Sequence, residues 1–198
     1  AGQLQDSQNH FELLNDIDMN EVSNTVSDVY GDEGDIGYIY GELDGANHTI
    51  KGKNSTDGTI LYAVNAVIKN VTFADLTHTA VRNATNTTFE NVTVNGSMEV
   101  GNNTGAFVVY AVPSNCEVTL TFDNCIADVE MEGPGVENAY NAVFVGYAYG
   151  QGNKTTLNFD SCVNNGSLVC GKAAMFLGNN SANGGYVTIN VNDCVNNG

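Results

Sequence analysis

The chain has 198 residues, of which 42% are hydrophobic, so it can bury a core of its own and is too apolar for intrinsic disorder. Asp and Glu number 23 against 6 Lys and Arg, which gives a formal net charge of −17. A surface of this sign repels phosphate backbones and anionic lipid headgroups, so nucleic acid is an unfavourable partner. No apolar run reaches the length of a membrane span, so no membrane insertion is expected in this segment.

The N-terminal part is expected to form a cap and the first coils of a single domain that covers residues 1–198. The cap and first coils would occupy residues 1–52, and repeated coils would occupy residues 53–198. The short stretch Gln3 to Asn9 would cover the open edge of the first coil, because an uncovered edge promotes end-to-end association. The chain ends on Cys194 to Gly198, which repeats Cys162 to Gly166, so we expect it to be a fragment of a longer protein.

An acidic, glycine-bearing loop follows the first apolar segment. Carboxylates on a flexible loop are hard oxygen ligands that suit Ca²⁺, although their spacing does not match an EF-hand. The loop therefore presents either a calcium site or an acidic surface of the kind expected in a chain of this charge. The candidate ligands are Asp28, Asp32, Glu33 and Asp35.

One phrase recurs along the rest of the chain. It consists of an apolar residue, a polar pair whose second member is Asn, Ser or Asp, and then Val or Cys. Three copies follow short alternating stretches such as Val118 to Phe122, which is the period-two pattern of a half-buried strand. The five copies begin at Ile68, Phe89, Phe122, Phe159 and Val191.

A second apolar phrase precedes each copy at one of two fixed offsets. The offset is 11 residues in the first two repeats, as from Ile60 to Val71, and 18 residues in the later three, as from Phe107 to Cys125. The distances between repeats are 21, 33, 37 and 32 residues, which do not fit one fixed repeat length but do fit a solenoid with turns of variable length. The sequence therefore predicts an all-β, right-handed parallel β-helix with irregular coil lengths and a short N-terminal cap.

Stacking of like residues from coil to coil predicts the core and the turns. Phe107, Phe144 and Phe176 would form an aromatic ladder. Asn-Gly and Asn-Asn pairs are interpreted as turns, and Asn70 and Asn91 as corner residues, because asparagine tolerates left-handed backbone. A second ladder would hold small buried side chains, with cysteine replacing valine without disulfide bonds; its members are Val71, Val92, Cys125, Cys162 and Cys194.

The change of offset places about seven extra residues at one point of each later coil, since 18 exceeds 11 by seven. These insertions, Ala111 to Glu117, Tyr149 to Lys154 and Asn179 to Gly185, should lie side by side on one flank, where repeat proteins often bind partners. Tyrosines at the end of the second phrase would form either a platform for sugar rings or a packed corner between strands. The candidate ligand-binding residues are Tyr62, Tyr110, Tyr147, Asn115, Asn153 and Asn180.

Phe11 to Asn20 and Tyr40 to Gly52, followed by coils that read I-x-N-V, resemble the opening of bacterial and archaeal surface β-helix proteins with GLUG-type repeats. Tyr40 stands where that group usually has Phe. The resemblance implies a secreted or surface-anchored, adhesin-like protein whose partner is a glycan or protein of a host or cell surface.

Catalysis is not expected, because no residue set suits the chemistry that β-helix enzymes perform. A polysaccharide lyase needs a basic residue, and Lys69 has no recurring carboxylate cluster beside it in the sequence. Asp123 and Asp160 lie one coil apart, but they occupy equivalent surface positions of the repeat. We therefore predict a non-catalytic extracellular structural or adhesive module without a cofactor, Ca²⁺ aside. The alternative is a carbohydrate-binding or carbohydrate-active β-helix.

Overall fold

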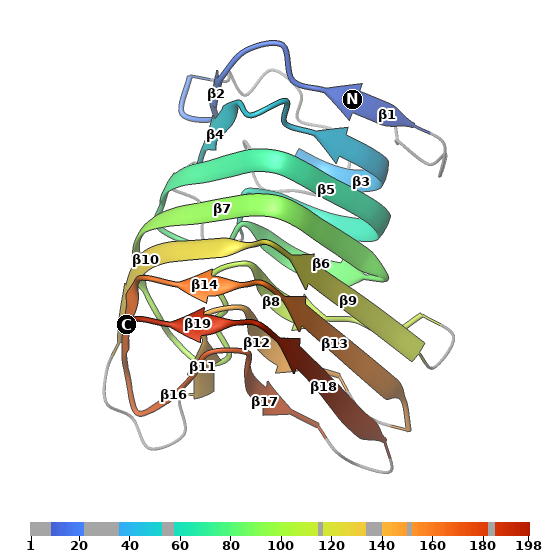
Figure 1. The fold of residues 1–198 in the computed structure, drawn as a ribbon, viewed down its shortest axis with the longest axis vertical. Coiled ribbons are helices and arrows are strands. Elements are labelled where there is room, and N and C mark those ends of the chain that lie inside the picture. Colours follow the sequence, from blue (N-terminus) through green and yellow to red (C-terminus); the bar gives the residue numbers. More distant parts are fainter. Residues whose placement is uncertain are drawn as a thin grey trace.

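The computed structural model describes residues 9–21, 36–52, 58–114, 117–133, 140–149, 152–181 and 185–198. In these ranges the chain is all-β and winds into stacked coils whose strands pair in parallel with the coils above and below (Figure 1). The predicted parallel β-helix is confirmed. Of the expected capping stretch, residues 3–8 lie outside the described ranges.

Each complete coil contributes strands to three faces, named here in the order in which the chain passes through them. Face 1 is formed by the first parts of β3 (Ile36–Asp44) and β5 (Ile60–Leu76), then β6 (Val81–Thr85), β8 (Val108–Ala111), β12 (Val145–Ala148) and β17 (Leu177–Asn180). This face lies at the back of the view in Figure 1.

Face 2 continues from face 1 after a corner. It contains β1 (His10–Glu12), the end of β3, the middle of β5, the first part of β7 (Thr87–Glu99), β9 (Glu117–Asp123), β13 (Lys154–Asp160) and β18 (Tyr186–Asn192). Residues on these strands alternate between buried and exposed, as the sequence pattern predicts for one face on the core and one in water.

Face 3 completes the coil before the chain returns to face 1. It contains β2 (Ile17–Asp18), β4 (Thr49–Lys51), the ends of β5 and β7, β10 (Ile126–Glu132), β14 (Val163–Asn164), β15 (Ser167–Val169) and β19 (Val195–Asn196). A separate pair, β11 (Tyr140–Ala142) and β16 (Lys172–Ala174), lies on the return path.

Two phenylalanine columns fill the middle of the solenoid. The predicted ladder is confirmed, with ring centroids 4.8 Å apart between Phe107 and Phe144 and 6.1 Å apart between Phe144 and Phe176. The first residues of the repeated phrase form a second column, in which Phe122 stacks on the neighbouring rings above and below at 4.9 Å. The two columns meet edge to face, for example at 5.7 Å between Phe107 and Phe122, which is a favourable geometry for aromatic rings.

The valine and cysteine ladder is confirmed from Val71 to Cys162, whereas Cys194 in the last coil is only partly buried. Val71 and Val92 are in register, and both are almost fully buried. Cys125 and Cys162 are completely buried with free thiols, and burial raises the pKa of Cys125 well above its ordinary value. Cysteine therefore acts here as a small hydrophobe. Cys116 lies outside the described residues.

Asparagines turn the corner between faces 2 and 3. Asn70, Asn91 and Asn124 have φ values of 50°, 53° and 50°, so the predicted left-handed corner is confirmed. The Asn91 amide donates to Oδ1 of Asn70 at 3.1 Å, and the Asn124 amide donates to Oδ1 of Asn91 at 2.8 Å. These hydrogen bonds between asparagine side chains link successive coils at the corner. The left-handed conformation of the same residues turns the backbone there.

Asn91→Ala is expected to lower the free energy of unfolding by about 1–2 kcal/mol, because alanine is strained in left-handed backbone and breaks the amide ladder. Asn91→Gly removes the amide but relieves the strain, so its loss should stay below about 1 kcal/mol. Urea unfolding of both variants separates the two effects. Equal losses for the two variants would contradict a backbone role for Asn91.

The strands that flank the three insertions lie where the prediction requires. Each insertion connects a paired strand of face 1 to a paired strand of face 2, so all three leave successive coils at the same corner. The interpretation of Asn-Gly pairs as turns is wrong at Asn95-Gly96, which lies inside β7. There the sheet register shifts between Phe73 and Leu76, and the glycine lets β7 pass close to Leu76.

Candidate functional site

Face 1 carries a column of tyrosines at one register position, as the sequence predicts. Tyr38 pairs with Tyr62, and Tyr110 pairs with Tyr147. Asn83 occupies the same position between the two pairs, and its amide donates to the Leu61 carbonyl at 3.2 Å. The predicted row therefore exists as two aromatic groups separated by one asparagine.

The second aromatic group is a cluster of Tyr110, Tyr147 and Tyr149, which we call the tyrosine cluster. The ring of Tyr149 lies 4.9 Å from Tyr147 and 5.7 Å from Tyr110, measured between centroids. Tyr149 is 40% exposed and the other two are half-buried, so the cluster presents ring surface to solvent. Burial, helped by the phenols of Tyr110 and Tyr147, raises the pKa of Tyr149. Tyr149 stands two residues after Tyr147, and this spacing puts both on one side of an extended chain.

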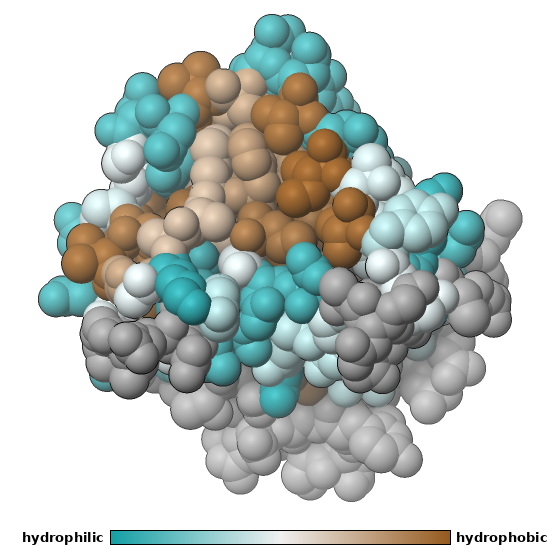
Figure 2. Space-filling model, turned by 90° about the horizontal axis from the view of Figure 1, so that it is seen from below, coloured by the Kyte–Doolittle hydropathy of each residue, from teal (hydrophilic) through white to brown (hydrophobic). Residues whose placement is uncertain are grey.

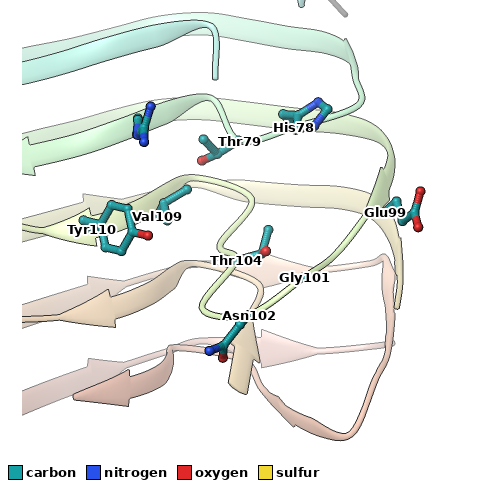
Figure 3. A pocket seen from close by; sticks show the side chains of 9 residues that line it. His78, Thr79, Glu99, Gly101, Asn102, Thr104, Val109 and Tyr110 are labelled. Carbon is teal, nitrogen blue, oxygen red and sulfur yellow. The ribbon is translucent and has the colours of Figure 1, made fainter. Parts of the chain in front are cut away.

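A polar hollow of about 260 Å³ adjoins this cluster and shares Tyr110 with it. Figure 3 shows Val109 and Tyr110 of β8 on one side, Glu99 at the end of β7 on the other, and Thr79 and Thr104 between them. Its walls come from face 1, from the return loops that precede β6 and β8, and from the end of β7 on face 3. The complete lining is His78, Thr79, Arg82, Glu99, Gly101, Asn102, Thr104, Val109 and Tyr110.

No protein-family model, curated protein or solved structure matches the chain.

The lining of the hollow mixes hydrogen-bond donors and acceptors. Arg82, the only arginine of the chain, supplies a donor fork, and Glu99 supplies an acceptor carboxylate. Asn102 and the threonine and tyrosine hydroxyls can act in either sense. Such a set suits a ligand rich in hydroxyl groups. The sequence offers one signal for a role of Arg82, which is that the only arginine of the chain directly follows the apolar residue Val81.

The candidate asparagines lie at the insertion corner. Asn180 is exposed at the end of β17 and pairs with Ala148, one position beyond the tyrosine column. Asn153 precedes β13, and its carbonyl accepts from the Tyr186 amide at 3.1 Å. Asn115 and the proposed calcium ligands Asp28, Asp32, Glu33 and Asp35 lie outside the described residues. Within the described ranges, no group of His, Cys, Asp and Glu is arranged to hold a metal ion.

Lys69 lies in a charge network on face 2, which corrects the expectation that no carboxylate cluster accompanies it. Its ammonium is 2.9 Å from Glu42 and 3.4 Å from Asp44, and His10 lies 2.7 Å from Glu42. The sequence hid this arrangement, because Glu42 and Lys69 are 27 positions apart and meet only through strand pairing. The hydrogen bond with Glu42 raises the pKa of Lys69, so the lysine stays protonated and is a poor base.

The carboxylates considered for hydrolysis lie in one exposed row of face 2. Asp123 pairs with both Glu90 and Asp160, so the row repeats once per coil. Asp160 accepts a 2.8 Å hydrogen bond from the Asn192 amide one coil further on. The spacing of these carboxylates follows from the strand ladder, so the row is what a repeated surface position produces in a parallel solenoid.

No helix of membrane-spanning length and apolarity occurs in the described ranges.

Proposed function

We propose that this chain is a non-catalytic adhesive module of an extracellular microbial protein, and that it binds glycans through the tyrosine cluster and the adjoining hollow. The observation that carries the proposal is their contiguity on face 1, where Tyr110 belongs to both. Aromatic rings stack on the apolar faces of sugars, while a mixed donor and acceptor lining bonds to their hydroxyl groups.

The size of the site supports a small unit of a longer glycan. A volume of about 260 Å³ lies just below the range of about 300–1,000 Å³ that is typical of drug-sized ligands, so one ring-sized unit fits. Further units would then extend over Tyr147 and Tyr149, whose rings lie 6.2 Å and 5.7 Å from Tyr110.

Two further features support an extracellular adhesive role. The N-terminal motifs resemble those of surface β-helix proteins, and the net charge of −17 favours solubility over association with nucleic acid. The strand register keeps the insertions and the site in a fixed arrangement along the solenoid, which suits display of a binding surface.

Glycan-array binding of the intact chain tests the proposal. Tyr110→Ala and Arg82→Gln are each expected to weaken binding about tenfold, equivalent to about 1.4 kcal/mol, because each removes a contact with the sugar. Tyr186→Ala is the matched control, since this tyrosine is 60% exposed but lies on face 2. Absence of glycan binding by the unmodified chain, or full retention of binding in a Tyr110→Ala and Tyr147→Ala double variant, would contradict the proposal.

A further inference from the structure

Face 1 is almost free of charge, although the chain as a whole is strongly acidic. Its described strand segments contain no Asp, Glu or Lys, and Arg82 is their one charged residue; the segments are 36–40, 60–64, 81–85, 108–111, 145–148 and 177–180. The other two faces carry carboxylates, such as Asp123 on β9 and Glu130 on β10. In the hollow, Glu99 offsets the charge of Arg82. Face 1 is therefore an uncharged strip along the solenoid.

The strip holds a first aromatic group, formed by Tyr38, Tyr40 and Tyr62, in addition to the tyrosine cluster. The ring of Tyr38 lies 4.5 Å from that of Tyr62 and 6.0 Å from that of Tyr40, and the planes differ by 7° and 5°. Because Tyr38 and Tyr62 stack from coil to coil, the other face of the Tyr62 ring is turned towards Asn83 in the next coil. Asparagine is too short to cover a tyrosine ring, so this ring face borders the coil that carries Arg82 and the hollow.

The first aromatic group, the hollow and the tyrosine cluster follow one another along the solenoid axis. Successive coils place Tyr38, Tyr62, Asn83, Tyr110 and Tyr147 at one register position. With neighbouring strands about 4.8 Å apart, this column is about 19 Å long. Apolar side chains fill the interior of the solenoid, as the view along its axis in Figure 2 shows at the last coil. A ligand that contacts both aromatic groups must therefore lie along the outside of face 1.

We propose that face 1 binds a straight, neutral glycan chain of the cellulose type, which lies along the solenoid axis and contacts both aromatic groups. This inference rests on the proposed glycan binding and names the class of glycan. In such a chain the hydroxyl groups are equatorial, so each sugar ring presents apolar faces that can contact aromatic side chains. The carboxylates of faces 2 and 3 would repel an anionic chain and would draw a cationic chain away from face 1.

Calorimetric titration of the intact chain with cello-oligosaccharides, from the disaccharide to the hexasaccharide, tests the length of the site. The Kd is expected to fall at least about tenfold over this series, because only the longer chains reach both aromatic groups. Raising the salt concentration should leave the Kd of the neutral hexasaccharide unchanged, since no charge pair is involved.

Two matched probes with the same linkage test the preference for a neutral chain. One is the cello-hexasaccharide whose primary alcohols are oxidised to carboxylates, and the other is the chitosan hexasaccharide, which carries ammonium groups. At physiological salt, each is expected to bind at least about tenfold more weakly than the neutral hexasaccharide, because face 1 offers no surplus charge to either.

Tyr62→Ala separates the two aromatic groups. It is expected to weaken binding of the neutral hexasaccharide about tenfold and to leave the Kd of the disaccharide unchanged, because the hollow and the tyrosine cluster are intact. Tyr186→Ala on face 2 is the matched control and should bind both like the unmodified chain. The length series needs no substitution, so it remains decisive even where Tyr62→Ala fails to fold.

The outcomes distinguish this inference from the proposed function. Glycan binding without affinity for cello-oligosaccharides, an affinity that stops rising at the disaccharide, or a preference for either charged hexasaccharide would overturn this inference alone. Equal loss of disaccharide and hexasaccharide binding in folded Tyr62→Ala would also overturn it. Binding of no saccharide by the unmodified chain would overturn the proposed function and this inference together.

Discussion

Phe122→Ala is expected to lower the free energy of unfolding by about 3–5 kcal/mol, the usual range for deleting a buried aromatic side chain. Phe122 is fully buried, and it lies in the middle of one phenylalanine column and against the other. Its ring stacks on Phe89 and Phe159 at 4.9 Å and meets Phe107 and Phe144 edge to face at 5.7 and 5.5 Å. Alanine would leave a cavity at this position. The surrounding rings cannot move in to fill it, because they are packed against one another.

Urea unfolding followed by circular dichroism measures this loss, and two comparisons make it specific. Phe122→Leu keeps most of the volume and should cost less than about 1.5 kcal/mol. Phe176→Ala should cost less than Phe122→Ala, because Phe176 is only partly buried. A loss below about 1 kcal/mol for Phe122→Ala would show that the aromatic columns do not dominate core stability.

The repeat pattern was sufficient to predict the fold because a parallel solenoid stacks equivalent residues. An apolar residue that recurs at a constant offset from Val or Cys must lie above its counterpart, as Phe107 and Phe144 do. The corner asparagines follow from the same logic, since Asn70 and Asn91 stand at one place in the phrase and both adopt left-handed backbone. Coil-length differences are confined to loops, so they did not obscure the register.

The candidate site was predicted only in part, because it depends on loops that do not repeat. The tyrosine column follows from the second phrase, and Tyr110 and Tyr147 lie where it places them. The hollow needs His78 and Asn102 from return loops of different length, and no periodicity relates these loops to Tyr110. The pairing of Lys69 with Glu42 was missed for a similar reason, since Glu42 precedes the first copy of the phrase.

In a solenoid, the close approach of neighbouring coils also requires glycine at certain backbone positions, which composition alone does not identify. Asn95-Gly96 has the sequence of a turn, yet it continues β7 across face 3 and pairs with β10 through Val129. Strand pairing on both sides of Gly96 overrides the local turn preference. A similar close approach occurs two coils further on at Gly166, where an added Cβ would lie 2.0 Å from the Val129 carbonyl oxygen.

Gly96→Ala is therefore expected to lower the free energy of unfolding by about 3 kcal/mol or more, from backbone strain and overpacking of about 1–3 kcal/mol each. Gly96 has φ of +146°, and an added Cβ would lie 2.2 Å from the Leu76 carbonyl oxygen. Gly37→Ala is the matched control in β3, because nothing lies within 4 Å of its added Cβ; thermal unfolding should show a change within about 0.5 kcal/mol. Similar losses for both variants would mean that general strand flexibility, rather than the contact with Leu76, requires glycine at position 96.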